Sequence, residues 1–265
     1  MKTPIVTLTT DWGNQGFFAG MVKGALYSMV EGVQVVDIAH HIEPFNKLSA
    51  SFVVMHACMG FPPGTVHIID IASTQPFLAV KARDQYFLCC DNGIPYMAFG
   101  DQVQEAVNIP LQQNGVYNFA AYSLFTRVAS QLLHGAPLSD IGPRLSQLTP
   151  STMTGWIPQG DQYRINILYV DSYGNAYLGM SYSQFEQLRQ GRRFAVTVRD
   201  YEVTEVSSSY HHQQQNVQPS RPYQRQPLKL TVSATGMLEL TMTESSFSQL
   251  LGLHARDSVL LRFKD

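Results

Sequence analysis

Two aspartates stand at the ends of apolar, strand-like runs in the first half of the chain. Asp11 comes shortly after residues 5–9, and Asp70 comes directly after residues 65–69. Open α/β sheets bind their ligands beyond the carboxyl ends of the strands. A carboxylate there can act as a general base or accept hydrogen bonds from a ribose diol, with helix capping or a turn as the structural alternatives. Asp11 and Asp70 are therefore candidate binding and catalytic residues.

A third aspartate opens a turn in the second half of the chain. The turn reads Asp171-Ser172-Tyr173-Gly174-Asn175 and follows the apolar run 165–170. Asp, Asn and Gly form such turns for conformational reasons alone. Several aromatic residues lie in loops or at strand ends, outside the periodic core positions: Trp12, Phe45, Phe119, Tyr173 and Tyr177. Each one alone is explained by packing, but together they could enclose a planar base or a cation.

The cysteines do not indicate a metal or disulfide protein. The chain has three, Cys58, Cys89 and Cys90, too few for a disulfide framework and without the CxxC spacing of a zinc site. The adjacent pair follows an apolar run and is expected to be reduced and buried in a strand. His211-His212 could bind adventitious metal, but a solvated loop explains it better. We therefore expect no metal site.

The candidate residues of the first half must be positioned by alternating strands and helices. The resulting β-α-β-α-β series predicts an α/β domain with a mostly parallel sheet between helices. A hairpin with Arg83-Asp84 at its turn is expected at one side of this sheet. The predicted strands are 5–9, 33–38, 65–69, 77–82 and 85–90, and the predicted helices are 18–29, 49–59 and 122–133.

From about Gly155 onward the pattern changes to short strands separated by turns. It predicts a small antiparallel β-barrel or sheet as a second domain, with the division at 1–154 and 155–265. Residues 207–226 are rich in Ser, His, Gln and Pro and predict a mobile surface loop. The predicted strands are 164–170, 194–198, 202–206, 228–232, 237–242 and 259–263, and the predicted short helices are 183–190 and 246–251.

Charge and hydropathy exclude several partner classes. The 265 residues carry a formal net charge of −2, which provides no basic field for nucleic acid or an anionic membrane. No run approaches the roughly 18 apolar residues of a membrane span, and no signal-peptide pattern opens the chain, so we expect a cytoplasmic protein. Only 14% of the residues are charged, against roughly 25% on average. A covered subunit surface or an exposed Gln-rich surface would each explain this.

Several motifs follow one another along nearly the whole chain. They are Leu8-Thr9-Thr10-Asp11-Trp12-Gly13, Asp37-Ile38-Ala39-His40-His41-Ile42-Glu43-Pro44-Phe45, Phe61-Pro62-Pro63-Gly64-Thr65-Val66-His67, Asp91-Asn92-Gly93, Asp171-Ser172-Tyr173-Gly174-Asn175 and Gly236-Met237-Leu238-Glu239-Leu240. In this collinear order they resemble the motifs of the S-adenosylmethionine (SAM) hydroxide adenosyltransferase family, which also contains the fluorinase and chlorinase enzymes.

The resemblance implies an α/β N-terminal domain, a β-barrel C-terminal domain and a homotrimer that binds a small adenosyl ligand between subunits. By motif position Asp11 would hold the ribose hydroxyls, and Ser73 would lie near the sugar. Phe45 and Phe119 would line the adenosyl pocket. The neighbouring subunit would supply the remaining site residues, of which Asp171 and Asn175 would contact the methionine part and Tyr173 and Tyr177 would form aromatic walls. SAM would be the substrate or ligand, with no cofactor besides it.

Family chemistry is substitution at the ribose C5′ with methionine as leaving group. In the water-using members an Asp, an Arg and a His surround the attacking water, and Asp70 stands at the position of the Asp. The other two partners differ: residues 70–81 contain no Arg, and Ala120 stands where the family has His. Ala121 likewise lacks the hydroxyl of the fluorinase serine, while Arg83 or Arg127 could reach the site from elsewhere.

Two functions of different classes follow from this combination. The first is hydrolysis of SAM to adenosine and methionine by water attack at C5′, with Asp70 as the catalytic residue. The alternative is a non-catalytic SAM- or adenosine-binding homologue that has lost the water-activating Arg and His. A positioned base or charge donor commonly contributes about 10² to 10⁴ in rate, so losing two partners is a substantial change.

Overall fold

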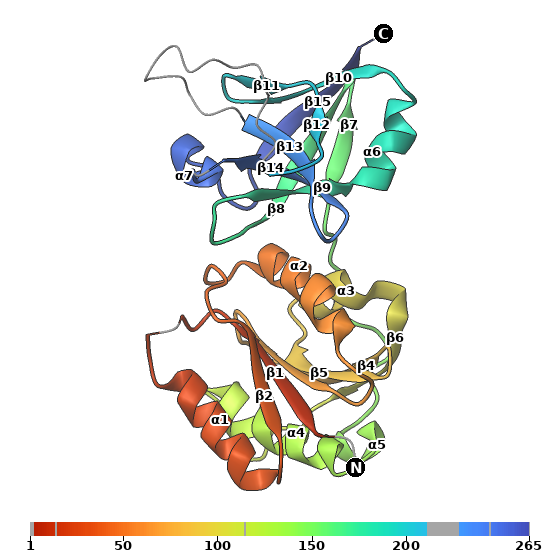
Figure 1. The fold of residues 1–265 in the computed structure, drawn as a ribbon. Coiled ribbons are helices and arrows are strands. Elements are labelled where there is room, and N and C mark those ends of the chain that lie inside the picture. Colours follow the sequence, from red (N-terminus) through yellow and green to blue (C-terminus); the bar gives the residue numbers. More distant parts are fainter. Residues whose placement is uncertain (1–2, 14, 114, 211–227, 244, 265) are drawn as a thin grey trace. The chain divides into compact units, whose positions relative to one another are not determined.

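The computed structural model describes residues 3–13, 15–113, 115–210, 228–243 and 245–264 (Figure 1). The chain divides into two compact units, Met1–Thr152 and Met153–Asp265. Each unit has a hydrophobic core of its own. Within the described ranges, no helix combines the length and the apolar character needed to cross a membrane.

The first unit is built on a six-stranded sheet with the strand order β2-β1-β3-β5-β4-β6. The four strands β2, β1, β3 and β5 run parallel, and β4 pairs antiparallel with both β5 and β6. The α/β architecture with a mostly parallel sheet is therefore confirmed. The strands are β1 (Ile5–Thr10), β2 (Gln34–Ala39), β3 (Val66–Asp70), β4 (Phe77–Ala82), β5 (Gln85–Cys90) and β6 (Val103–Asn108).

Helices cover both faces of this sheet. Figure 1 shows α1 and α4 on one face and α2 and α3 on the other. Val6 and Leu8 of β1 are buried against the α1 and α4 face, where Leu26 and Val128 join the same core. The helices are α1 (Phe18–Met29), α2 (Lys47–Ala57), α3 (Ile94–Phe99), α4 (Thr126–Leu133) and α5 (Leu138–Ile141), with tight turns η1 (Cys58–Gly60) and η2 (Gly100–Gln102) and a π-helical turn η3 (Ala121–Phe125).

Most elements of the first unit lie where the sequence pattern predicts them. The helix at Phe18–Met29 and the hairpin strands β4 and β5 have the predicted bounds. Arg83 and Asp84 both adopt positive φ, 49° and 59°, as a tight hairpin turn requires. The predicted helix at 122–133 is part π-helical turn and part α4. The sequence prediction omitted β6 and α3.

The second unit is a nine-stranded sheet with the path β11-β10-β15-β8-β9-β14-β13-β12, and β7 pairs with β8 beside it. Every pair is antiparallel except β12 with β13. Closure into a small barrel stays a prediction, because this hydrogen-bonded path ends at β11 and β12. The elements are β7 (Trp156–Gln159), β8 (Gln162–Val170), β9 (Ala176–Ser181), α6 (Tyr182–Arg189), β10 (Arg193–Val198), β11 (Tyr201–Val203), β12 (Val206–Ser207), β13 (Leu228–Val232), β14 (Met237–Met242), α7 (Phe247–Leu251) and β15 (Ser258–Lys264).

Two glycines let backbone segments of the second unit touch directly. A Cβ on Gly179 would lie 2.3 Å from Cα of Gly155, and a Cβ on Gly155 would lie 2.0 Å from the Gly179 carbonyl oxygen. No side chain fits at either position without moving the backbone. Neither β7, which follows Gly155, nor β9, which contains Gly179, was among the predicted strands. The loop predicted at 207–226 lies outside the described residues from 211 onward.

Candidate functional site

The carboxyl ends of the parallel strands bring the candidate residues of the first unit together. β1, β2, β3 and β5 end at Thr10, Ala39, Asp70 and Cys90, and parallel strands end at one edge of a sheet. The antiparallel β4 begins at this edge, so the turn before it, which contains Ser73, lies there as well. The loops after these strands therefore form one candidate site.

Asp70 is the last residue of β3 and is 3% exposed. Its Oδ2 accepts a hydrogen bond of 2.9 Å from the Trp12 indole Nε1, whereas Oδ1 accepts none from any described residue. Burial raises the pKa of Asp70, an effect that the Ser73 hydroxyl and the Trp12 indole only partly offset and to which Asp11 adds. A carboxylate with a raised pKa and one oxygen available accepts a proton more readily than an ordinary aspartate does.

Trp12 is held by rings on two sides. Its ring lies 6.0 Å from the His40 ring at 19° and 5.0 Å from the Phe119 ring at 73°. His40 is itself fixed, because its Nδ1 lies 2.7 Å from Oγ1 of Thr10. On its other side, Nε2 is 3.0 Å from Oδ1 of Asp37, without the alignment of a hydrogen bond. The indole N–H is thus directed at Asp70 by its packing.

Asp11 ties two other loops to the end of β1. Its Oδ2 accepts 3.2 Å hydrogen bonds from the backbone N–H groups of Phe45 and Ala72. Both residues have left-handed backbone conformations, with φ of 63° and 49°, which cost energy for residues other than glycine. Asp11 therefore has a structural function that its sequence position did not indicate. Its Oδ1 accepts no hydrogen bond within the described part of the chain and remains able to bind a ligand hydroxyl.

The aromatic candidates lie at the rim of this site. The Phe45 side chain is 72% exposed. Phe119 packs edge-on against Phe18, with ring centroids 5.1 Å apart, and stacks on Tyr122 at 6.3 Å and 11°. Exposed and half-exposed rings beside two carboxylates form a surface onto which a planar heterocycle can stack.

Ser73 and Cys90 meet at the end of β5. The Ser73 Oγ lies 3.6 Å from the Cys90 Sγ, and the backbone N–H of Thr74 donates to the same sulfur at 3.2 Å. Burial raises the pKa of Cys90 to about 11, despite these hydrogen bonds. The thiol therefore stays protonated at neutral pH and is a poor nucleophile.

The structure also locates the residues that differ from the water-activating set. Ala120 and Ala121 are 1% and 0% exposed and lie at the start of the π-helical turn. Arg83 lies in the hairpin turn before β5, at the opposite edge of the sheet from Asp70. It donates from Nε to Oε1 of Gln102 at 2.5 Å, so it does not serve Asp70 of its own chain. Arg127 is exposed on the first turn of α4.

The candidate residues of the second unit surround the β8–β9 turn. Asp171 Oδ1 accepts 2.9 Å hydrogen bonds from the backbone N–H groups of Tyr173 and Asn175. Its Oδ2 accepts a 3.1 Å bond from Asn175 Nδ2, and Thr241 Oγ1 donates to Asn175 Oδ1 at 2.6 Å. Asp171 and Asn175 thus stabilise the turn, and this turn leaves the Tyr173 side chain 79% exposed.

A buried carboxylate that the sequence reasoning missed lies beside this turn. Glu239 of β14 is fully buried and is paired across the strands with Tyr177 of β9. Its Oε2 accepts a 2.8 Å hydrogen bond from the Tyr210 hydroxyl, and Oε1 has no partner among the residues that the structure describes. Burial raises the pKa of Glu239, more than Tyr210 lowers it. The signal in the sequence was a single charged residue inside the apolar strand 237–242.

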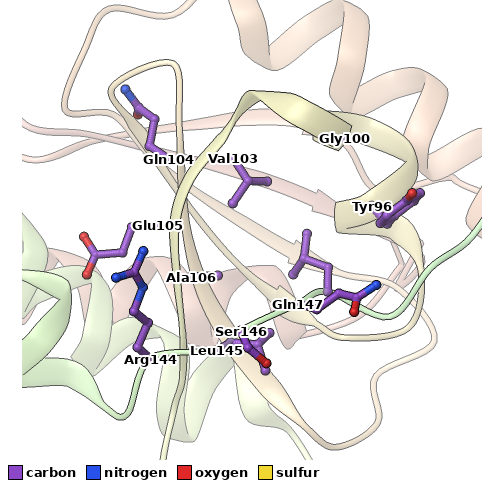
Figure 2. A pocket seen from close by; sticks show the side chains of 11 residues that line it. Tyr96, Gly100, Val103, Gln104, Glu105, Ala106, Arg144, Leu145, Ser146 and Gln147 are labelled. Atoms are coloured by element: carbon purple, nitrogen blue, oxygen red, sulfur yellow. The ribbon is translucent and has the colours of Figure 1, made fainter.

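A separate cavity of about 260 Å³ lies at the edge strand β6 of the first unit (Figure 2). Figure 2 shows Glu105 and Arg144 at one side of it and Tyr96 and Gln147 at the other. Its lining includes the amino-terminal half of β6 and none of the candidate residues. This cavity is therefore distinct from the candidate site. Across the described ranges, no three His, Cys, Asp or Glu side chains are grouped to hold a metal ion.

Comparison with protein families gives two matches that together span most of the chain. Residues 6–142 match the SAM hydroxide adenosyltransferase N-terminal domain, and residues 165–260 match the C-terminal domain of the same family. A relative from Salinispora tropica, named (R)-S-adenosyl-L-methionine hydrolase, is 28% identical over 207 residues, which are 72% of this chain and 77% of the relative. One from Methanocaldococcus jannaschii with the same name is 32% identical over 98 residues, 34% of this chain and 37% of the relative.

Solved structures agree on the fold. The crystal structure of an uncharacterized conserved protein from Thermotoga maritima matches with a TM-score of 0.82 at 24% identity, covering 97% of this chain and 99% of that one. A conserved hypothetical protein from Thermus thermophilus matches with a TM-score of 0.72 at 20% identity, covering 99% of this chain and 100% of that one. In each of these two structures, a single chain has the folds of both units.

Proposed function

The chain belongs to the SAM hydroxide adenosyltransferase family, and we propose that it hydrolyses SAM to adenosine and methionine. The observation that carries this proposal is Asp70, a buried carboxylate with a raised pKa and an oxygen that accepts no hydrogen bond from the described residues. It lies at the ligand-binding edge of an α/β sheet, in a chain whose relatives are named SAM hydrolases.

The proposed step is an in-line substitution at C5′ of the ribose. A water oxygen forms a bond to C5′ while the C5′–S bond breaks. The electron pair of the C5′–S bond stays on sulfur, which becomes the thioether of methionine. The water loses a proton to Oδ1 of Asp70, which later releases it to solvent. Because the sulfonium is already a good leaving group, the protein must chiefly place and desolvate the water. Because Asp70 is deeply buried, a water bound to its carboxylate would be both held in place and shielded from solvent.

Substrate binding is assigned to the residues around Asp70. Asp11 would accept hydrogen bonds from the ribose hydroxyls through Oδ1, because Oδ2 is occupied by two backbone N–H groups. Phe45 and Phe119 would enclose the adenine ring, and Ser73 would lie near the sugar. These assignments rest on the aromatic rings at the rim of the site and on Oδ1 of Asp11, which accepts no hydrogen bond from the described residues.

We assign the methionine part of the substrate to the second unit of a neighbouring subunit in a homotrimer. Asp171 and Asn175 would contact the amino acid group, and Tyr173 and Tyr177 would form aromatic walls beside it. The high exposure of Tyr173 supports such a contact, since large exposed aromatics are enriched at interfaces. Sedimentation equilibrium at several protein concentrations tests the trimer, and a monomer at all of them would contradict it.

A non-catalytic SAM- or adenosine-binding function is the second candidate. It is favoured by the apolar character of Ala120 and Ala121, and by the position of Arg83 at the far edge of the sheet. With Ala120 at the position of the family's His and no Arg in residues 70–81, Asp70 would have to activate the water without these two partners. Such a protein would bind the ligand in the same pocket and release it unchanged.

Chromatography of reactions with each sulfonium epimer of SAM distinguishes the two candidates. Both epimers are needed because the curated relatives are named for the R form. Adenosine and methionine formed in equal amounts, above the rate without enzyme and absent with Asp70→Asn, would support hydrolysis. Stoichiometric binding in calorimetry without product would support the binding function. Neither binding nor turnover by folded protein would reject both.

A further inference from the structure

We propose that Trp12 is the positioning residue of this site, because its indole N–H holds Oδ2 of Asp70 and leaves Oδ1 as the oxygen that receives the proton. The inference rests on the proposed function in so far as Asp70 acts as the base. Trp12 is one of the aromatic residues that could stack on a ligand. In this proposal its polar N–H group acts on Asp70 instead.

The geometry of Trp12 supports this role over simple packing. The Nε1 of Trp12 is 2.9 Å from Oδ2, a normal length for a hydrogen bond to a carboxylate. The ring is confined between His40 and Phe119, and His40 is fixed by Thr10. An indole has one donor and no acceptor, so in this orientation its N–H can serve only the carboxylate.

The groups that face Asp70 explain why a neutral donor matters there. Asp11 lies close enough to disfavour a second negative charge, and burial acts in the same direction. The neighbouring Cys90 thiol is neutral, and Lys47 lies near enough to that thiol to lower its pKa slightly. A cationic donor in place of Trp12 would pull the pKa of Asp70 down and weaken it as a base. The indole fixes the direction of the carboxylate while its pKa stays raised.

Trp12→Phe tests the role, because phenylalanine keeps an aromatic ring between His40 and Phe119 and lacks the donor, although it is smaller than the indole. We expect kcat to fall at least about tenfold while KM changes less than about threefold, the pattern of an interaction that supports the chemical step. Losing a donor that favours the ionised form should also move the acid limb of the pH–rate profile upward by about one pH unit. The control is Trp156→Phe in the second unit, whose ring packs edge-on to Tyr163 at 5.6 Å.

A spectroscopic test separates failure of this inference from failure of the proposed function. The chain has two tryptophans, so Trp156→Phe leaves Trp12 as the single indole. We expect its fluorescence to change with pH as Asp70 ionises, and this transition to be lost when Asp70→Asn is added. If the transition appears in protein that does not hydrolyse SAM, the Trp12–Asp70 link stands and the proposed function fails. An unchanged rate and pH profile in Trp12→Phe would refute the inference, and so would a transition that persists with Asp70→Asn.

Discussion

Replacing Asp11 by alanine should destabilise the first unit because this carboxylate holds two loops in unfavourable conformations. The Oδ2 atom accepts backbone hydrogen bonds from Phe45 and Ala72, which follow β2 and β3. Both residues have positive φ. Asp11→Ala removes both bonds at once, and nothing else in the described contacts pulls the two N–H groups toward the end of β1.

The expected loss is about 2–3 kcal/mol of unfolding free energy. A hydrogen bond to a charged group contributes about 1.5–3 kcal/mol when buried, and these two are partly exposed, so each is placed at about 1–1.5 kcal/mol. At 3.2 Å both bonds are also slightly longer than the most common length. Asp101→Ala, an exposed carboxylate in the same unit, is the control and should change stability by less than about 0.5 kcal/mol.

A second substitution tests whether Asp11 holds Ala72 in its left-handed conformation. In otherwise unchanged protein, Ala72→Gly should stabilise by about 0.5–1 kcal/mol, because relief of the left-handed cost exceeds the entropy that glycine loses on folding. In the Asp11→Ala protein this gain should vanish, since residue 72 is then free to leave positive φ. Such coupling between contacting residues is measured by a double-mutant cycle.

The assay is urea unfolding followed by the fluorescence of Trp12, in protein carrying Trp156→Phe throughout. Trp12 reports on the first unit, so unfolding of the second unit does not enter the signal. A loss below about 1 kcal/mol for Asp11→Ala would refute the reasoning, because the two bonds would then contribute no more than water does. Equal gains from Ala72→Gly in both backgrounds would show that Asp11 does not impose the conformation.

Three further predictions concern both units. Asp70→Asn should abolish turnover with ligand affinity within about tenfold by calorimetry. The raised pKa means that the folded wild type favours the protonated acid, so the stability of the wild type falls as pH rises through that pKa. In Asp70→Asn, the decrease in stability between pH 4 and pH 8, measured by thermal unfolding, should therefore be smaller than in the wild type. Activity that survives this change would show that Asp70 is not the base. Gly179→Ala should cost more than about 2 kcal/mol in chemical unfolding of the second unit, because its Cβ would meet Gly155; a cost near zero would contradict that close approach. Tyr210→Phe should destabilise the protein by about 1–3 kcal/mol at pH 8 and by less at pH 4, because burial raises the pKa of Glu239 and so favours its protonated form in the folded protein at low pH. A pH-independent effect would exclude loss of a donor to the carboxylate as the cause.

Local patterns in the sequence were sufficient for most secondary structure. The apolar spacing of Phe18–Met29 predicts a helix wherever it packs, because the face it buries is set by residues three and four apart. The strands around Arg83-Asp84 are equally local, since a two-residue turn specifies their pairing. Elements with weaker local signals, β6 and β9 among them, were missed. β6 pairs with β4, which is not its neighbour along the chain, and β9 pairs both with its neighbour β8 and with the distant β14.

The identity of the candidate residues was also accessible from the sequence, but their partners were not. Motif positions selected Asp11, Asp70 and Asp171, and the collinear motifs predicted the family that the comparisons confirm. The sequence could not show that Asp11 binds two backbone N–H groups, or that Asp171 organises its own turn. A side chain's hydrogen bonds depend on where backbone donors come to lie after packing, and the residue type does not reveal that.

The sequence by itself determined the composition of the site: two carboxylates at strand ends, aromatic residues in the neighbouring loops, and alanines at 120 and 121. Only the tertiary structure decided how they act together. Trp12 and Asp70 are 58 residues apart, and they meet because β1 and β3 are adjacent parallel strands that end at the same level. Burial between the helices then raises the pKa of Asp70. Both effects arise from packing between distant segments, and that packing makes one aspartate the candidate base and the other a tie between loops.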